Sequence, residues 1–138
     1  MNGFYRLLNF GIHGDHNGSL VALERHNEIP FDIQRVYYIW GTKFNVIRGK
    51  HAHVNLEQII ICVSGSCEFT LDNGLGVRKK VILNSPDKGL YLASMVWREF
   101  TNFSEDCVII VIASLPYFED DYIRSYTEFV NKAKKLSA

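Results

Sequence analysis

Short runs of alternating apolar and polar residues recur along most of the chain. They are rich in Val, Ile, Tyr and Phe, and Gly, Asn, Asp and Pro separate them. One separator, Asp72-Asn73-Gly74, is a typical hairpin signal between two runs. Many short strands with turn residues between them predict an all-β sandwich or barrel. The runs lie at residues 4–10, 18–24, 33–40, 57–65, 67–74, 77–83, 89–94, 96–102 and 106–114.

A helical periodicity is convincing only near the end of the sequence. Apolar residues from Tyr122 to Ala133 form one stripe at helical spacing. Acidic residues at 119–121 precede this stripe and Lys132, Lys134 and Lys135 lie near its end, an order that suits the helix dipole. We therefore expect a C-terminal helix at about residues 120–135, a barrel at about 4–115, and a single domain spanning residues 1–138.

The composition favours a small-molecule partner. A chain of 138 residues with 47% hydrophobic content is long enough for one domain with a real core. Fifteen basic residues balance fifteen acidic ones, so neither nucleic acid nor an anionic membrane is expected as a partner. The first residues match neither a signal peptide nor a membrane span, which predicts a cytoplasmic protein.

The cysteines also fit a cytoplasmic protein. Cys62, Cys67 and Cys107 lie inside apolar runs and lack paired Cys-x-x-Cys spacing. Their odd number argues against a disulfide framework. We expect buried free thiols and no structural zinc site.

The stretch from Arg48 to His53 puts two imidazoles two positions apart in a predicted strand. Because successive strand side chains point to opposite faces, His51 and His53 share one face. Inside a barrel, such a pair is suited either to holding a metal or to moving protons.

This stretch begins a segment that resembles the first signature of the cupin barrel. Two histidines two positions apart are followed by four residues, Gln58, six residues and Gly65. Residues 86–102 resemble the second signature. Metal-binding cupins have Glu and His where this chain has Gln58 and Arg98. Since Gln is a weak ligand and Arg offers no lone pair, no metal and no cofactor is expected.

The ordered segments from GSLVALE at residue 18 to DDYIRSY at residue 120 are more specific, and they resemble the nucleotide-sugar 3,4-ketoisomerases. Those cupins act on dTDP-4-keto-6-deoxyglucose on the route to 3-amino-3,6-dideoxy sugars. The resemblance runs from about residue 8 to residue 126. It implies a jelly-roll barrel, a homodimer, a dTDP-linked 4-keto-6-deoxy sugar as ligand, and His51 and His53 as the acid/base pair. A dimer would also cover the apolar edge of the first run.

The resemblance and the strand geometry together suggest individual roles. His53 is the preferred base for the proton on carbon 3, with His51 as its partner, although the order is open to reversal. Asn17 and Arg98 depart from residues that many relatives have, and both are expected to influence how the sugar lies. The other expected substrate contacts are Arg48 to the diphosphate, Tyr37 to the sugar, Trp97 to a ring, and Lys50.

Arg98 also bears on the product. A permanently charged guanidinium is a poor proton donor, so abstraction and return are expected on one face of the sugar. That predicts the gluco product, dTDP-3-keto-6-deoxyglucose. Three alternatives are a nucleotide-sugar 3,5-epimerase, a metal-dependent cupin dioxygenase and a sugar-nucleotide-binding module without activity. Two histidines on one face favour catalysis over a module of this kind, because binding alone needs no base.

Overall fold

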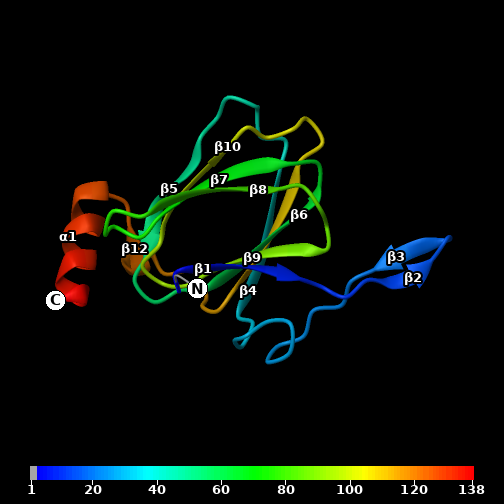
Figure 1. Cartoon of the computed structure of the whole chain (residues 1–138), viewed down its shortest axis with the longest axis horizontal. Coiled ribbons are helices and arrows are strands. Elements are labelled where there is room, and N and C mark those ends of the chain that lie inside the picture. The colour runs from blue at the N-terminus through cyan, green and yellow to red at the C-terminus, as the bar shows by residue number, and fades with distance from the viewer. Residues whose placement is uncertain (1–2) are drawn as a thin grey trace.

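The computed structural model describes residues 3–138 as two five-stranded antiparallel sheets that form a barrel, with a helix at one end (Figure 1). The strand order is β1-β9-β6-β11-β4 in the first sheet and β12-β5-β10-β7-β8 in the second. The predicted all-β cupin barrel with a C-terminal helix is confirmed. The elements are β1 (Tyr5–Asn9), β2 (His13–Asp15), β3 (Gly18–Leu20), β4 (Arg35–Trp40), β5 (Arg48–His53), β6 (Gln58–Ser64), β7 (Cys67–Asp72), β8 (Arg78–Leu83), β9 (Lys88–Leu92), β10 (Trp97–Thr101), β11 (Val108–Ala113), the 3-10 turn η1 (Glu119–Asp121), β12 (Tyr122–Ile123) and α1 (Tyr126–Ser137).

The main core draws on strands of both sheets. Alternate side chains of each strand point inward, so Leu90 from β9 packs in one cluster with Phe69 and Leu71 from β7. A second cluster lies where Ile29 and Phe31 pack against Ile59 and Ile61 of β6. Burial of these side chains is the main contribution to the stability of the barrel.

The C-terminal helix begins later than the sequence pattern predicts. Its first residue is Tyr126, and the Ser125 side chain accepts a hydrogen bond from the Glu128 backbone N–H at 3.3 Å. Upstream, the Asp121 carboxylate accepts backbone N–H bonds from Asn55 at 2.8 Å and Leu56 at 3.2 Å. These contacts hold the preceding segment against β5, so residues 122–123 form a strand where a helix was expected.

Two other segments differ in detail from the expected pattern. Only Gly18–Leu20 of the run at 18–24 is a strand, and it pairs with β2 in a hairpin that projects away from the barrel (Figure 1). The hairpin predicted at Asp72 joins β7 to β8, as expected. Its connection spans residues 73–77, because the Asn73 side chain accepts N–H bonds from Leu75 at 2.8 Å and Val77 at 3.1 Å.

The cysteines are buried and free, as predicted. Of the helices described in residues 3–138, none is long and apolar enough to cross a membrane.

Candidate active site

The two histidines lie side by side, as strand alternation predicts. Their ring centres are 4.9 Å apart on β5, which pairs with β10 on one side and β12 on the other. The strand is irregular just before them, where Gly49 has a φ of 85°. A Cβ at Gly49 would lie 2.8 Å from the Arg98 carbonyl oxygen, so this close approach requires glycine.

His51 has the properties of a base that a ligand can reach. Its Nδ1 lies 3.1 Å from the Gly49 carbonyl oxygen, an acceptor, so Nδ1 carries the proton. That tautomer leaves a lone pair on Nε2, and the ring lines the pocket described below. Burial, and then the charge of Arg98, lower the pKa of His51 to about 4. The imidazole is therefore neutral near pH 7 and able to accept a proton.

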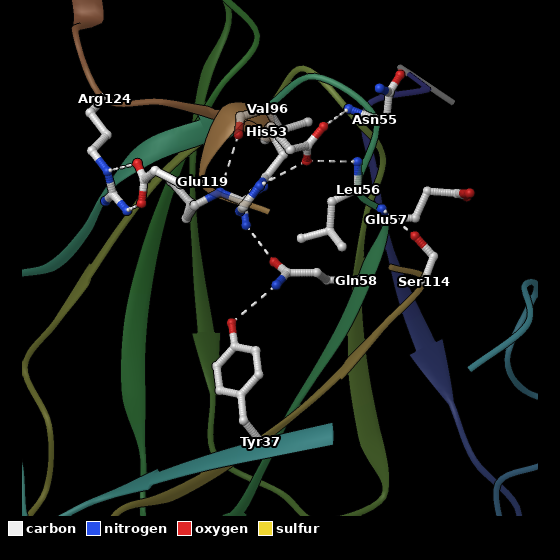
Figure 2. Close-up of polar contacts among 12 residues, drawn as sticks. Tyr37, His53, Asn55, Leu56, Glu57, Gln58, Val96, Ser114, Glu119 and Arg124 are labelled. Carbon is white, nitrogen blue, oxygen red and sulfur yellow. Dashed lines mark hydrogen bonds and ion pairs between the residues drawn. The ribbon is translucent and has the colours of Figure 1, made fainter. Parts of the chain in front are cut away.

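His53 lies deeper, with only 1% of its surface exposed. Its Nδ1–H donates to the Asp121 carboxylate at 3.2 Å, the same carboxylate that is bound to the backbone of Asn55 and Leu56 (Figure 2). Burial, then Arg98 and His51, lower the pKa of His53 to about 2. Its buried Nε2 has no hydrogen-bond partner within residues 3–138. A neutral imidazole with one fixed N–H and one unused acceptor is suited to relaying a proton.

Arg98 is almost fully buried, at 2% exposure, and points into the barrel. Its Nη1–H donates to the Gln58 side-chain oxygen at 2.5 Å and its Nε–H to the Val96 carbonyl at 3.2 Å. Gln58 in turn donates to the Tyr37 hydroxyl at 3.0 Å (Figure 2). Burial lowers the pKa of Arg98 to about 10, so the guanidinium stays charged near pH 7.

The two departures from the metal-binding cupin pattern therefore contact each other. Arg98 supplies a fixed positive charge beside the histidines, and Gln58 satisfies one of its donors without adding a negative charge. That charge lowers the pKa of both histidines. A second cation among these groups would meet strong repulsion.

A pocket of about 440 Å³ opens in front of His51. Its walls are mainly aromatic and cationic, with one arginine from β4, one from β5 and one from the chain after β12. Such a lining suits a ligand that combines rings with negative charge. The lining residues are Arg35, Tyr37, Ile39, Arg48, Gly49, His51, Phe100, Tyr117, Tyr122 and Arg124.

The three arginines differ in how their donors are used. Arg48 donates from Nε to the Thr42 hydroxyl at 3.2 Å. Arg124 makes two 2.9 Å contacts with the Glu119 carboxylate (Figure 2). Arg35 lies 5.1 Å from the centre of the Tyr37 ring, and its buried Nε has no partner in the described part of the chain. Because Arg35 lines the pocket, a ligand there can contact its guanidinium.

Five predicted site residues belong to this arrangement, and one of them is His53 beside His51. Tyr37, Arg48 and His51 line the pocket, and Arg98 lies behind it with Tyr37 and Gln58. Strand alternation turns Tyr37 inward, whereas Tyr38 is 63% exposed.

Three predicted substrate contacts lie elsewhere in this chain. Trp97 points to the opposite face of β10 from Arg98 and packs against Phe129 of α1, with ring centres 5.8 Å apart. Its position explains its burial without a ligand, so a stacking role is not supported. Asn17 is exposed at the tip of the β2–β3 hairpin, and Lys50 is exposed on β5. Neither lies among the lining residues of the pocket.

Sequence reasoning missed several residues of the site. Arg35 was detectable, because it lies two positions before Tyr37 on one strand and so shares its face. Asp121 and Tyr122 were not detectable, because their pattern was read as part of a helix. Only their pairing with β5 brings them beside the histidines.

The barrel, the paired imidazoles and the buried guanidinium together define a candidate site of the cupin type. Comparison with known proteins narrows this class. Residues 4–134 match the FdtA family, described as WxcM-like, C-terminal. A curated relative from Aneurinibacillus thermoaerophilus, named TDP-4-oxo-6-deoxy-alpha-D-glucose-3,4-oxoisomerase, is 46% identical over 96% of this chain and 94% of its own length.

Solved structures agree with this match. A TDP-quinovose 3,4-ketoisomerase from Campylobacter jejuni is 46% identical, with a TM-score of 0.89 over 95% of this chain and 99% of that one. A TDP-fucose-3,4-ketoisomerase from the same organism is 36% identical, with a TM-score of 0.91 over 100% of both chains. The chain belongs to the FdtA family of sugar 3,4-ketoisomerases. The predicted family and the predicted isomerase class are confirmed.

Proposed function

We propose that this isomerase converts TDP-4-keto-6-deoxyglucose into the corresponding 3-keto sugar. The observation that carries the proposal is the accessible, neutral His51 imidazole at the floor of a cationic pocket, beside the charge of Arg98. Moving the ketone from carbon 4 to carbon 3 requires removal of the carbon 3 proton, an enediol, and return of a proton to carbon 4. A neutral imidazole within reach of the sugar is suited to the first step.

The accessibility of the two histidines favours the reverse of the order expected from the sequence. His51 lines the pocket and is the proposed carbon base, whereas His53 is buried behind it. His53 then relays protons to and from the sugar oxygens through its unused Nε2, with Asp121 holding the opposite N–H. The fixed charge of Arg98 lowers the energy of the negative charge that develops on the enediol oxygens.

The arginines support recognition of a nucleoside diphosphate. A guanidinium provides several N–H donors that match phosphate oxygens in geometry and charge. Arg35 from β4 and Arg48 from β5 both line the pocket. We assign these two side chains to the diphosphate, with Tyr117 and Tyr122 providing ring surfaces for the base. Tyr37 is then the phenol nearest to the sugar.

An exchange experiment in deuterated water tests this function. The protein is incubated with TDP-4-keto-6-deoxyglucose, and the positions of deuterium in the sugar are read by proton NMR. Entry at carbons 3 and 4 is expected for the isomerase. Deuterium at carbon 5 would instead identify a 3,5-epimerase, and no exchange at all would leave a binding module.

The lowered pKa of His51 predicts how kcat/KM depends on pH at acidic pH. A base with a lowered pKa stays neutral and active until the pH falls to that value. We expect kcat/KM to remain level as pH falls through ~6.5, the ordinary histidine value, and to decline only as pH approaches about 4. Short assays after a pH jump keep unfolding out of the measurement. A decline centred near the ordinary value would contradict the assigned base or its environment.

We also propose that the protein is a homodimer. The support is an exposed apolar surface on the first sheet, where Val36, Tyr38 and Trp40 of β4 are 55%, 63% and 68% exposed. Sedimentation at micromolar concentration should give about twice the 15.9 kDa mass of the chain. Trp40→Glu should shift the protein toward monomer, whereas Ile82→Glu on the other sheet should not. A monomeric wild-type protein would contradict the proposal.

The biological setting follows from the same assignment. A 3-keto-6-deoxy sugar nucleotide is a substrate for transamination at carbon 3, so we propose a role in making 3-amino-3,6-dideoxy sugars for lipopolysaccharide or another glycan. A cytoplasmic location is part of this proposal. We propose the gluco configuration for the product, which the higher identity to the TDP-quinovose relative supports.

A further inference from the structure

The three cysteines meet at one point in the core, although they are separated in the sequence. Cys62 comes from β6, Cys67 from the start of β7 and Cys107 from the residue before β11. Their sulfur atoms all lie within 4.8 Å of one another, and those of Cys62 and Cys107 are 3.7 Å apart. The short connection from β6 to β7, which lie in different sheets, joins the first two, and the pairing of β6 with β11 brings in the third.

We propose that this thiol cluster binds a thiophilic divalent cation, with Zn²⁺ as its occupant. Sulfurs that are each ~2.3 Å from a tetrahedral zinc ion lie about 3.8 Å apart, close to the separation of Cys62 and Cys107. The Ser64 carbonyl oxygen, 3.2 Å from the Cys62 sulfur, is a candidate for the fourth ligand. Binding releases three thiol protons to solvent as three zinc–sulfur bonds form, and no electrons are transferred.

The burial of the cluster agrees with this geometry. All three cysteines are buried and free, and their sulfur atoms face one another inside the apolar core. A divalent cation at the centre of three thiolates would neutralise negative charge that such a core otherwise disfavours.

The site is separate from the proposed catalytic pocket, since none of the three cysteines is among the residues that line it. It lies close to the surface at Cys107, which is 5% exposed and follows a tight turn at residues 104–107. In that turn the Ser104 hydroxyl accepts the Ser66 N–H at 2.8 Å and donates to Asp106 at 2.8 Å. Under this proposal, an ion would enter beside Cys107 by displacement of this turn.

Titration of the reduced, metal-free chain with Cd²⁺ tests the proposal. A sulfur-to-cadmium charge-transfer absorption should grow to one equivalent, and native mass spectrometry with Zn²⁺ should show one ion per chain. Cys67→Ala and Cys107→Ala should each lose this absorption. Two controls should retain it: His26→Ala removes a surface histidine paired with Asp32, and His51→Asn removes the pocket histidine.

The rate at which the thiols of the wild-type protein react gives a second test, which does not depend on a cysteine variant that folds. One equivalent of Zn²⁺ should slow reaction of all three thiols with a thiol reagent at least about tenfold, and a chelator should restore the rate. Unprotected thiols, binding lost in His51→Asn, or a Cys62–Cys107 disulfide in place of a bound ion would each overturn the site. Isomerase turnover is measured separately, so failure here leaves the proposed function untouched.

Discussion

Replacing His51 with asparagine should lower the rate of isomerisation at least ~10²-fold, the usual contribution of a general base. Asparagine is polar and fits the edge of the pocket, so the barrel should stay folded. The substitution removes the imidazole that lines the pocket and is neutral near pH 7, so no histidine base faces the sugar there. Turnover is measured with TDP-4-keto-6-deoxyglucose, and circular dichroism reports the fold. His13→Asn, on the projecting hairpin, should keep wild-type turnover.

The partner variant His53→Asn separates the two histidines. If His51 is the carbon base, His53→Asn should still exchange the carbon 3 proton with deuterated water while net conversion falls by a similar factor. His51→Asn should lose both exchange and conversion. The opposite pattern would restore His53 as the carbon base, the order that the sequence favoured. Full turnover in both variants would remove the pair from the mechanism.

The alternation of strand side chains is the reason why much of the site was predictable. It places His51 beside His53 and turns Tyr37, and not Tyr38, toward the pocket. The same rule separates Trp97 from Arg98, because neighbours on one strand face opposite ways. Trp97 was nevertheless predicted as a substrate contact, since alternation does not reveal that α1 covers its face.

The rest of the site depends on contacts between distant segments. Asp121 accepts a hydrogen bond from His53, although the two residues are 68 positions apart in the sequence. The acidic residues beside Asp121 resemble the first turn of a helix, so the pattern did not indicate a site. His53 pairs with Tyr122 in the strand that follows Asp121, and the sequence pattern does not predict this contact. The cysteines are a second example, because their spacing in the sequence does not indicate that the sulfurs of Cys62 and Cys107 lie 3.7 Å apart.

The configuration of the product at carbon 4 depends on which groups can deliver a proton to each face of the enediol. Arg98 lies with Tyr37 and Gln58 behind the pocket, and its pKa of about 10 keeps it charged near pH 7. It is therefore a poor acid under working conditions, and it stabilises the enediol through its charge. Tyr37 is also a poor acid, because burial raises its pKa above the ordinary value.

The histidines are the remaining acids, and both lie on one face of β5. A proton taken from carbon 3 and returned to carbon 4 on the same side gives the galacto product, because the protons on carbons 3 and 4 of a gluco ring lie on opposite faces. The one-face transfer expected from the sequence therefore does not lead to the proposed gluco product, TDP-3-keto-6-deoxyglucose, which requires delivery of the proton to the opposite face. The product is labile, so it is trapped in ordinary water with a 3-aminotransferase. A large coupling between the protons on carbons 4 and 5 is expected for the gluco ring. A small coupling, as in a galacto ring, would mean that the proton returns on the face from which it was taken and would contradict the proposed gluco product.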